Sequence, residues 1–297
     1  QYAANFGTFD DLQILADYAV HRHFPEISNE DEKYRLMFRE VVKRQAQLIS
    51  KWQLAGFIHG VMNTDNMTIS GETIDYGPCA FMDTYAPDTV FSSIDTQGRY
   101  SYKNQPVMGE WNLTRLAEAF LPLFSEIKEK AVSIAQDEIS QFNKIYHSGW
   151  VRGMRSKLGI IDEEPEDEKL MEDLLSIMKK FSADYTNTFV SLTFDRHEES
   201  EMFRSSEFKN WHDLWRTKIS RQDNNKTFQL MKSSNPAIIP RNHRVEEALA
   251  AADTEDFSVM ERLLNALAKP YEYLPEQAEY AELPAEGSCK YRTFCGT

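Results

Sequence analysis

Cysteine and long apolar runs are scarce in this 297-residue chain. Only three cysteines occur, Cys79, Cys289 and Cys295. This small, odd number excludes a disulfide framework, and the spacing does not fit a zinc site. No run of roughly twenty apolar residues is present, and the N-terminus lacks a basic stretch followed by an apolar segment. The sequence therefore predicts a soluble protein.

Positive charge is also in deficit. The chain has 33 Lys and Arg residues against 47 Asp and Glu residues, a net charge of -14. Nonspecific binding to nucleic acid or to acidic membranes requires a basic surface, so neither partner is expected. A hydrophobic content of 41% with 12% aromatic residues is ordinary for a folded protein. The length allows one large domain or two.

Chemically competent side chains are densest in two neighbouring segments, HGVMNTDNM at 59–67 and TIDYGP at 73–78. Gly56 ends a long helical pattern, and Gly60 permits a backbone turn, so the first segment is predicted to be a loop. Short β-type runs stand on either side of Ser70-Gly71-Glu72. They predict a hairpin with a tight turn.

Three side chains of this hairpin suit catalysis on a nucleotide. Each strand residue advances only about 3.3 Å, so the return strand can bring Asp75 back to face the same cation as Asn66. Mg²⁺ prefers such oxygen ligands, and the phosphates of the substrate supply further oxygen ligands. Asp65 is the candidate base for a hydroxyl nucleophile. Local turn formation is the alternative role for each residue alone, but the clustering favours the kinase-like pattern.

The segment 59–78 resembles the signature of the selenoprotein O family. Members of this family have a protein-kinase-like fold and transfer AMP from ATP to protein hydroxyl groups. The resemblance extends over nearly the whole chain, which corresponds to the C-terminal portion of a full-length member. Further segments that resemble the family lie at 40–52, 81–83, 97–100, 104–106, 111–113, 154–159 and 240–243, with Cys295 near the end.

The resemblance implies a role for each residue of the motif. Asp65 matches the catalytic base, and Asn66 and Asp75 match the ligands of Mg²⁺ or Mn²⁺ that also contact the nucleotide. Asp75-Tyr76-Gly77 stands where kinases carry Asp-Phe-Gly. Val61 stands where related small-molecule kinases carry the catalytic Asp, and this departure is the family's own. The glycine-rich loop, the Lys–Glu pair and the phosphate-gripping basic residues belong to the family's N-terminal half.

The resemblance also implies a redox role for Cys295, which falls where some members carry selenocysteine. Cys79 is the first partner to test for a disulfide and Cys289 the second. The alternative is an exposed thiol at a frayed chain end. A cytoplasmic location is implied, although eukaryotic members are also mitochondrial.

Helical periodicity dominates the remaining sequence and predicts an α+β, predominantly helical fold. Residues 1–160 are expected to form a kinase-like C-lobe with the metal-site hairpin. Residues 161–297 are expected to form a helical extension packed on it, with an extended tail from about 272. Arg155 and Lys157 are predicted in a loop between Gly153 and Gly159, as a solvated turn more than a phosphate site. Helices are predicted at 8–19, 30–55, 111–121, 127–149, 170–181, 240–252 and 257–268.

Three functions remain open at this point. The favoured function is an ATP- and metal-dependent protein adenylyltransferase whose partners are ATP and protein substrates. The second is a kinase-type phosphotransferase, because nothing in these residues alone distinguishes attack at the α-phosphate from attack at the γ-phosphate. The third is a noncatalytic helical interaction module or inactive fragment.

Overall fold

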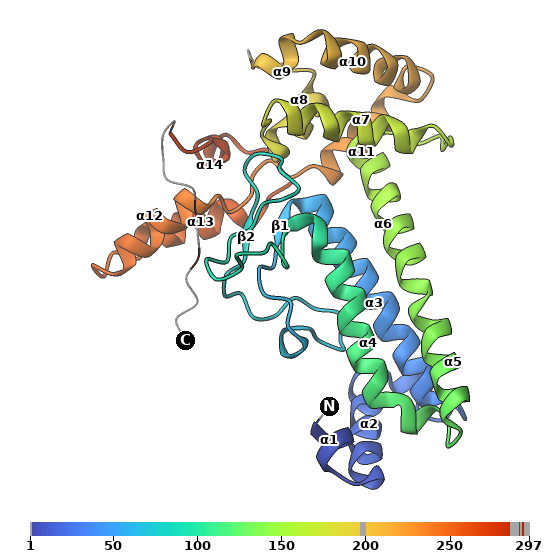
Figure 1. The fold of residues 1–297 in the computed structure, drawn as a ribbon. Coiled ribbons are helices and arrows are strands. Elements are labelled where there is room, and N and C mark those ends of the chain that lie inside the picture. The colour runs from blue at the N-terminus through green and yellow to red at the C-terminus, as the bar shows by residue number, and fades with distance from the viewer. Residues whose placement is uncertain (1, 197–199, 286–290, 292, 294–297) are drawn as a thin grey trace. The chain divides into compact units, whose positions relative to one another are not determined.

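The protein is predominantly helical, as predicted. The computed structural model describes residues 2–196, 200–285, 291 and 293 (Figure 1). Among these residues, no helix is long and apolar enough to cross a membrane. The α-helices are α1 (Tyr2–Phe6), α2 (Phe9–His23), α3 (Lys33–Ala55), α4 (Gln105–Phe124), α5 (Lys128–Ile139), α6 (Gln141–Lys157), α7 (Asp167–Lys180), α8 (Tyr185–Phe194), α9 (Glu201–Arg204), α10 (Ser206–Ile219), α11 (Asn224–Ser234), α12 (Asn242–Ala252), α13 (Ser258–Leu267) and α14 (Ala278–Ala281).

Extended structure is confined to short elements in the described part of the chain. Strand β1 (Phe57–Ile58) pairs antiparallel with β2 (Ala80–Phe81), with Phe57 opposite Phe81. The 3-10 helices are η1 (Pro25–Ile27), η2 (Thr64–Asn66), η3 (Tyr102–Asn104) and η4 (Pro275–Gln277).

One compact unit consists of Gln1–Lys51, Val61–Gly77 and Lys103–Gly149. Its core is built on the apolar stripe of α3, where Phe38 is fully buried and lies 5.6 Å from Phe124, centroid to centroid. α3 and α4 approach closely at Gly109, because a Cβ there would lie 2.3 Å from Cδ1 of Ile49. The predicted helix of 30–55 is confirmed.

A buried carboxylate ties α5 to α3 in this unit. Glu138 is 3% exposed, and its oxygens accept hydrogen bonds from Nε of Arg35 at 2.7 Å and Nε of Arg39 at 2.8 Å. Burial alone would raise the pKa of Glu138, but the two guanidinium groups hold it below its ordinary value. Glu138 and the two arginines therefore stay ionised, and their hydrogen bonds hold α5 against α3.

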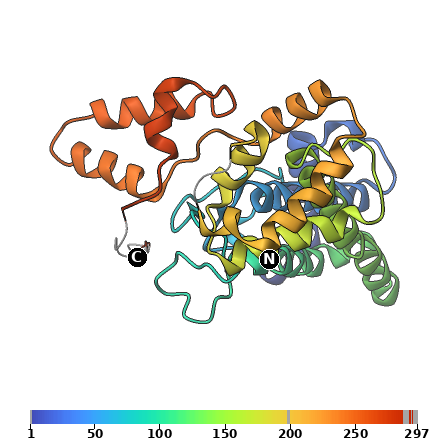
Figure 2. The same ribbon diagram turned by 90° about the horizontal axis from the view of Figure 1, so that it is seen from above.

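The other unit consists of Trp52–Gly60, Pro78–Tyr102 and Trp150–Thr297. Its core includes Tyr185 and Trp215, whose polar atoms are satisfied: the Tyr185 hydroxyl donates to the Gln53 carbonyl at 3.0 Å, and Trp215 Nε1 donates to the Leu158 carbonyl at 2.8 Å. α12 and α13 pack together as a helical hairpin (Figure 2), so the two predicted final helices are confirmed.

The predicted loop around Arg155 and Lys157 is wrong, because both residues lie in the last turns of α6. Arg155 Nε donates to Asp167 at 2.8 Å. Lys157 is 3% exposed, with Nζ lying 4.2 Å from the ring centroid of Phe189. Neither side chain forms a phosphate-binding turn, and Asp167 is a buried ion-pair partner of Arg155.

Candidate active site

The loop that follows β1 is held in place by a buried side-chain amide on α4. Asn112 is 7% exposed, and its Nδ2 donates to the carbonyl oxygens of Met62 at 3.0 Å and of Met108 at 2.9 Å. Met62 itself is fully buried. The backbone that leads to Asp65 is therefore fixed by core packing and by a tertiary hydrogen bond, which is the support that a positioned catalytic group needs.

Asp65 and Asn66 lie in η2 at the tip of this loop. The Asp65 side chain is exposed, whereas Asn66 is half-buried. Nδ2 of Asn66 donates to the Val61 carbonyl at 3.1 Å, which closes the loop on itself. This bond uses the donor end of the amide, and Oδ1 is the end that could ligate a cation.

The return arm is shorter than predicted. One antiparallel bridge joins Met67 to Thr73, in place of two short strands. The turn is closed by the Thr68 hydroxyl, which donates to the Glu72 carbonyl at 2.9 Å and accepts from the Glu72 amide at 3.0 Å. These bonds from the Thr68 side chain take the place of further backbone hydrogen bonds between the two arms. The pairing ends at this bridge, because Thr64–Asn66 form η2 on one side and Asp75 leaves the extended conformation on the other.

Asp75 has a left-handed backbone conformation, with φ of 56°, and an exposed side chain. Residues other than glycine adopt this region infrequently, although Asp tolerates it better than most. Such strained positions cluster at functional sites. The adjacent Tyr76 is 69% exposed. This conformation marks Asp75 as the most unusual backbone position of the motif.

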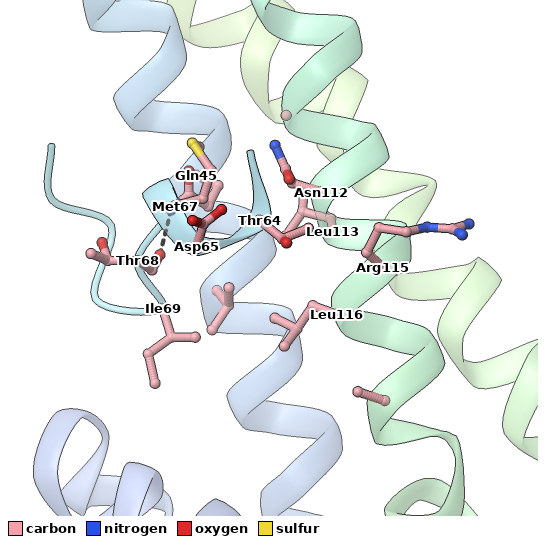
Figure 3. A pocket seen from close by; sticks show the side chains of 13 residues that line it. Gln45, Thr64, Asp65, Met67, Thr68, Ile69, Asn112, Leu113, Arg115 and Leu116 are labelled. Atoms are coloured by element: carbon pink, nitrogen blue, oxygen red, sulfur yellow. Dashed lines mark hydrogen bonds between the residues drawn. The ribbon is translucent and has the colours of Figure 1, made fainter. Parts of the chain in front are cut away.

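A cavity of about 270 Å³ opens beside Asp65. Its walls come from α3, from the segment after η2 and from α4, and Asp65 and Asn112 face this space from different elements (Figure 3). Among the residues that the structure describes, Asp65 is the one carboxylate that lines the cavity. A pocket with a positioned acceptor at its edge can hold a hydroxyl-bearing substrate against that acceptor.

A cation site would depend on few protein ligands. The described residues contain no group of three or more His, Cys, Asp or Glu side chains that could hold a metal. The chemistry of Asn66 and Asp75 suits Mg²⁺ or Mn²⁺ nevertheless, because Mg²⁺ usually takes one or two protein oxygens and completes its shell with phosphate and water.

Of the three cysteines, the structure describes Cys79. Cys79 is half-buried just before β2. Cys289 and Cys295 lie outside the described residues. The redox pairing of Cys295 with Cys79 therefore stays a prediction.

Sequence reasoning missed the positions of Gln45 and Asn112, which support the two arms of the site. Gln45 is 3% exposed, and its Nε2 donates to the carbonyl oxygen of Thr68 on the return arm. The available signal was a polar residue in a slot of the apolar stripe of α3. Such a residue must find a partner when it is buried.

The chain matches the family described as protein adenylyltransferase SelO over residues 4–268. It is 59% identical over 299 residues to protein nucleotidyltransferase YdiU of Clostridium beijerinckii, and 59% identical over 300 residues to the proteins of that name from Brevibacillus brevis and Alkaliphilus metalliredigens. Each comparison covers all of this chain and 61% of the relative, so the chain spans about three fifths of the length of these relatives. The chain belongs to the SelO family.

Proposed function

We propose that this chain is the catalytic portion of a protein adenylyltransferase with a kinase-like lobe, which uses ATP and Mg²⁺ or Mn²⁺ to attach AMP to protein Ser, Thr or Tyr hydroxyls. Family membership supports nucleotidyl transfer, since relatives carry the name protein nucleotidyltransferase. The observation that carries the proposal is the anchored loop, which presents an exposed Asp65 at the edge of a cavity.

In this proposal the acceptor hydroxyl lies against Asp65, which orients it and receives its proton. The hydroxyl oxygen forms a bond to the α-phosphorus, the bond from that phosphorus to the bridging oxygen breaks, and pyrophosphate leaves with the electron pair. Asn66 and Asp75 are the residues that would hold the divalent ion. When bound, this ion supplies positive charge that stabilises the phosphates in the transition state.

The test is mass spectrometry of a protein substrate after incubation with ATP and Mg²⁺. We expect an adenylyl adduct, and we expect Asp65→Asn to slow its formation by about 10²–10⁴. Asp31→Asn, at an exposed position far along the sequence from the motif, is the matched control and should keep full activity. Full activity in Asp65→Asn would contradict the assigned base.

Phosphoryl transfer is the second candidate, because Asp75-Tyr76-Gly77 stands in the place of the kinase Asp-Phe-Gly. The same spectrum distinguishes the two reactions, since adenylyl and phosphoryl adducts differ greatly in mass. A phosphoryl adduct that disappears in Asp65→Asn would favour the kinase.

A further inference from the structure

The cavity beside Asp65 offers few polar groups to a ligand. Among the described residues, its polar lining side chains are Gln45, Thr64, Asp65, Thr68, Asn112 and Arg115. The amide nitrogens of Gln45 and Asn112 donate to backbone carbonyls, and their oxygens are buried beyond the reach of a ligand. The Thr68 hydroxyl is bonded to the Glu72 backbone. Only Thr64 and Asp65, both exposed, remain available at the edge.

The walls of the cavity are apolar. Val41 on α3, Ile69 on the return arm and Leu116 on α4 line it, and Ile69 and Leu116 approach this space from different elements (Figure 3). The guanidinium of Arg115 points away from the cavity in Figure 3 and pairs with Glu118 at 2.7 Å, so its charge is offset. Water finds few hydrogen-bond partners in such a space, so an apolar group that displaces it binds favourably.

These walls are held in place before a ligand binds. Asn112 fixes the loop at Met62, and Gln45 fixes the return arm at Thr68. α3 and α4 are in close contact at Gly109, which also lines the cavity. A preformed pocket spends little binding free energy on ordering its own side chains.

The size of the cavity points to a single large side chain. At about 270 Å³ it lies below the range of about 300–1,000 Å³ that is typical of sites for drug-sized ligands. An apolar cavity of about 150 Å³ holds a benzene ring, so the ring of a phenylalanine and its connecting carbon fit here. Met67 also lines the cavity, and a thioether sulfur makes favourable contacts with aromatic rings. An aromatic side chain therefore matches the space better than a polar one.

We propose that this cavity is a specificity pocket for an aromatic side chain of the protein substrate, such as phenylalanine, that flanks the modified hydroxyl in sequence. The inference rests on the proposed function, which puts the hydroxyl against Asp65. Because Asp65 itself lines the cavity, the group that enters the cavity lies beside the hydroxyl. Successive residues of an extended peptide are about 3.3 Å apart, so a flanking side chain enters while the hydroxyl stays at the edge.

The experiment measures peptide binding by fluorescence anisotropy in the absence of nucleotide. Serine peptides carry phenylalanine or alanine at each position that flanks the serine. We expect one position at which the phenylalanine peptide binds about tenfold more tightly than the alanine peptide, the effect of burying an aromatic ring. Equal affinities at every position would overturn the proposal.

Three variants test the pocket itself. Leu116→Trp fills the cavity and should abolish the phenylalanine preference. Val107→Trp is the matched control, because Val107 is exposed on the same helix and does not line the cavity, and it should retain the preference. Leu116→Ala enlarges the cavity and should shift the preference from phenylalanine to tryptophan, a gain that poor folding could not produce. A phenylalanine preference that persists unchanged in both Leu116→Trp and Leu116→Ala would overturn the proposal.

The same peptides separate this inference from the proposed function. Nucleotide transfer to all serine peptides without a phenylalanine preference in binding would contradict the pocket and leave the transferase intact. Phenylalanine-selective binding that disappears in Leu116→Trp, without any nucleotide transfer, would support the pocket and contradict the transferase.

Discussion

Two polar clusters in this protein differ in whether their hydrogen bonds are complete. Arg241 is 1% exposed, and it donates to Asp83 at 2.7 Å, to Asp184 at 2.6 Å and to the Ala281 carbonyl at 3.0 Å. At the candidate site, by contrast, Asp65 is exposed and the oxygens of Gln45 and Asn112 have no partner among the described residues.

This difference distinguishes residues that stabilise the fold from residues that can bind a ligand. A buried group whose nitrogen atoms all have partners is explained by the fold that it holds together. An exposed carboxylate at the edge of a cavity, such as that of Asp65, can meet a ligand instead. Variants of the first kind should lower stability, and variants of the second kind should lower function while stability changes little.

The largest stability effect is expected at Arg241. Arg241→Met leaves the carboxylates of Asp83 and Asp184 without their cation, so the free energy of unfolding should fall by about 3–5 kcal/mol. Urea denaturation measures this change. Arg216→Met, whose guanidinium is half-exposed and only 4.0 Å from Asp195, is the matched control and should lose less than about 1 kcal/mol. Similar losses in both variants would contradict the comparison.

Gly109→Ala should have the next largest effect. The added Cβ would lie 2.3 Å from Ile49 and 3.0 Å from Phe142, so α3 and α4 would have to shift. We expect a loss of about 1–3 kcal/mol in the free energy of unfolding. Ala117→Gly is the opposite change, because it removes a methyl group from the same helix instead of adding one. An unchanged midpoint of thermal unfolding in Gly109→Ala would show that the helices are not in close contact.

Lys157 should make stability depend on pH. Burial lowers the pKa of Lys157 to about 7 in the folded state, below its ordinary value of 10.5. Between these values the unfolded chain binds a proton that the folded chain does not, so the free energy of unfolding should rise with pH, by at most about 1.4 kcal/mol per pH unit. The ring of Phe189 favours the charged form and reduces this slope.

The measurement is urea denaturation at pH values between 7 and 10 for the wild type and for Lys157→Met. The variant should lose this contribution to the slope. The exposed Lys169→Met is the control and should keep it. Identical slopes in the wild type and in Lys157→Met would mean that Lys157 stays charged when folded.

Asp75→Gly should have the smallest effect on stability and a large effect on binding. Glycine adopts the φ of 56° without strain, which offsets its greater freedom in the unfolded chain, so the free energy of unfolding should change by less than about 0.5 kcal/mol. Titration calorimetry with ATP should show that Mg²⁺-dependent heat is lost. Equal heats in variant and wild type would remove the proposed cation ligand and favour a noncatalytic module.

The sequence was sufficient where the structure depends on local spacing. Gly56, with φ of 73°, ends α3 as predicted, and the loop with Asp65 and Asn66 follows it. Gln45 and Asn112 could not be assigned in the same way, because their roles depend on tertiary contacts with the backbone of Thr68 and Met62. A hydrogen bond between residues far apart in sequence leaves no periodic pattern.

The glycines near Arg155 explain why a loop is predicted there although the chain is helical. The sequence predicts that a helix ends at 149 and that a loop begins at Gly153, yet α6 continues through Gly149 and Gly153. A Cβ at Gly149 would lie 2.9 Å from Oγ of Ser50, and one at Gly153 would lie 2.1 Å from Cδ1 of Leu54. These glycines therefore allow close helix packing, a use that single-sequence patterns do not separate from turn formation.

Gln45 gives the return arm a thermodynamic linkage to α3. Its Nε2 donates to the carbonyl oxygen of Thr68, next to the bridge between Met67 and Thr73 that leads to Asp75. Cation binding that orders this arm and the bond from Gln45 should therefore stabilise each other. By reciprocity, Gln45→Met should weaken the Mg²⁺-dependent binding of ATP although Asp75 is unchanged.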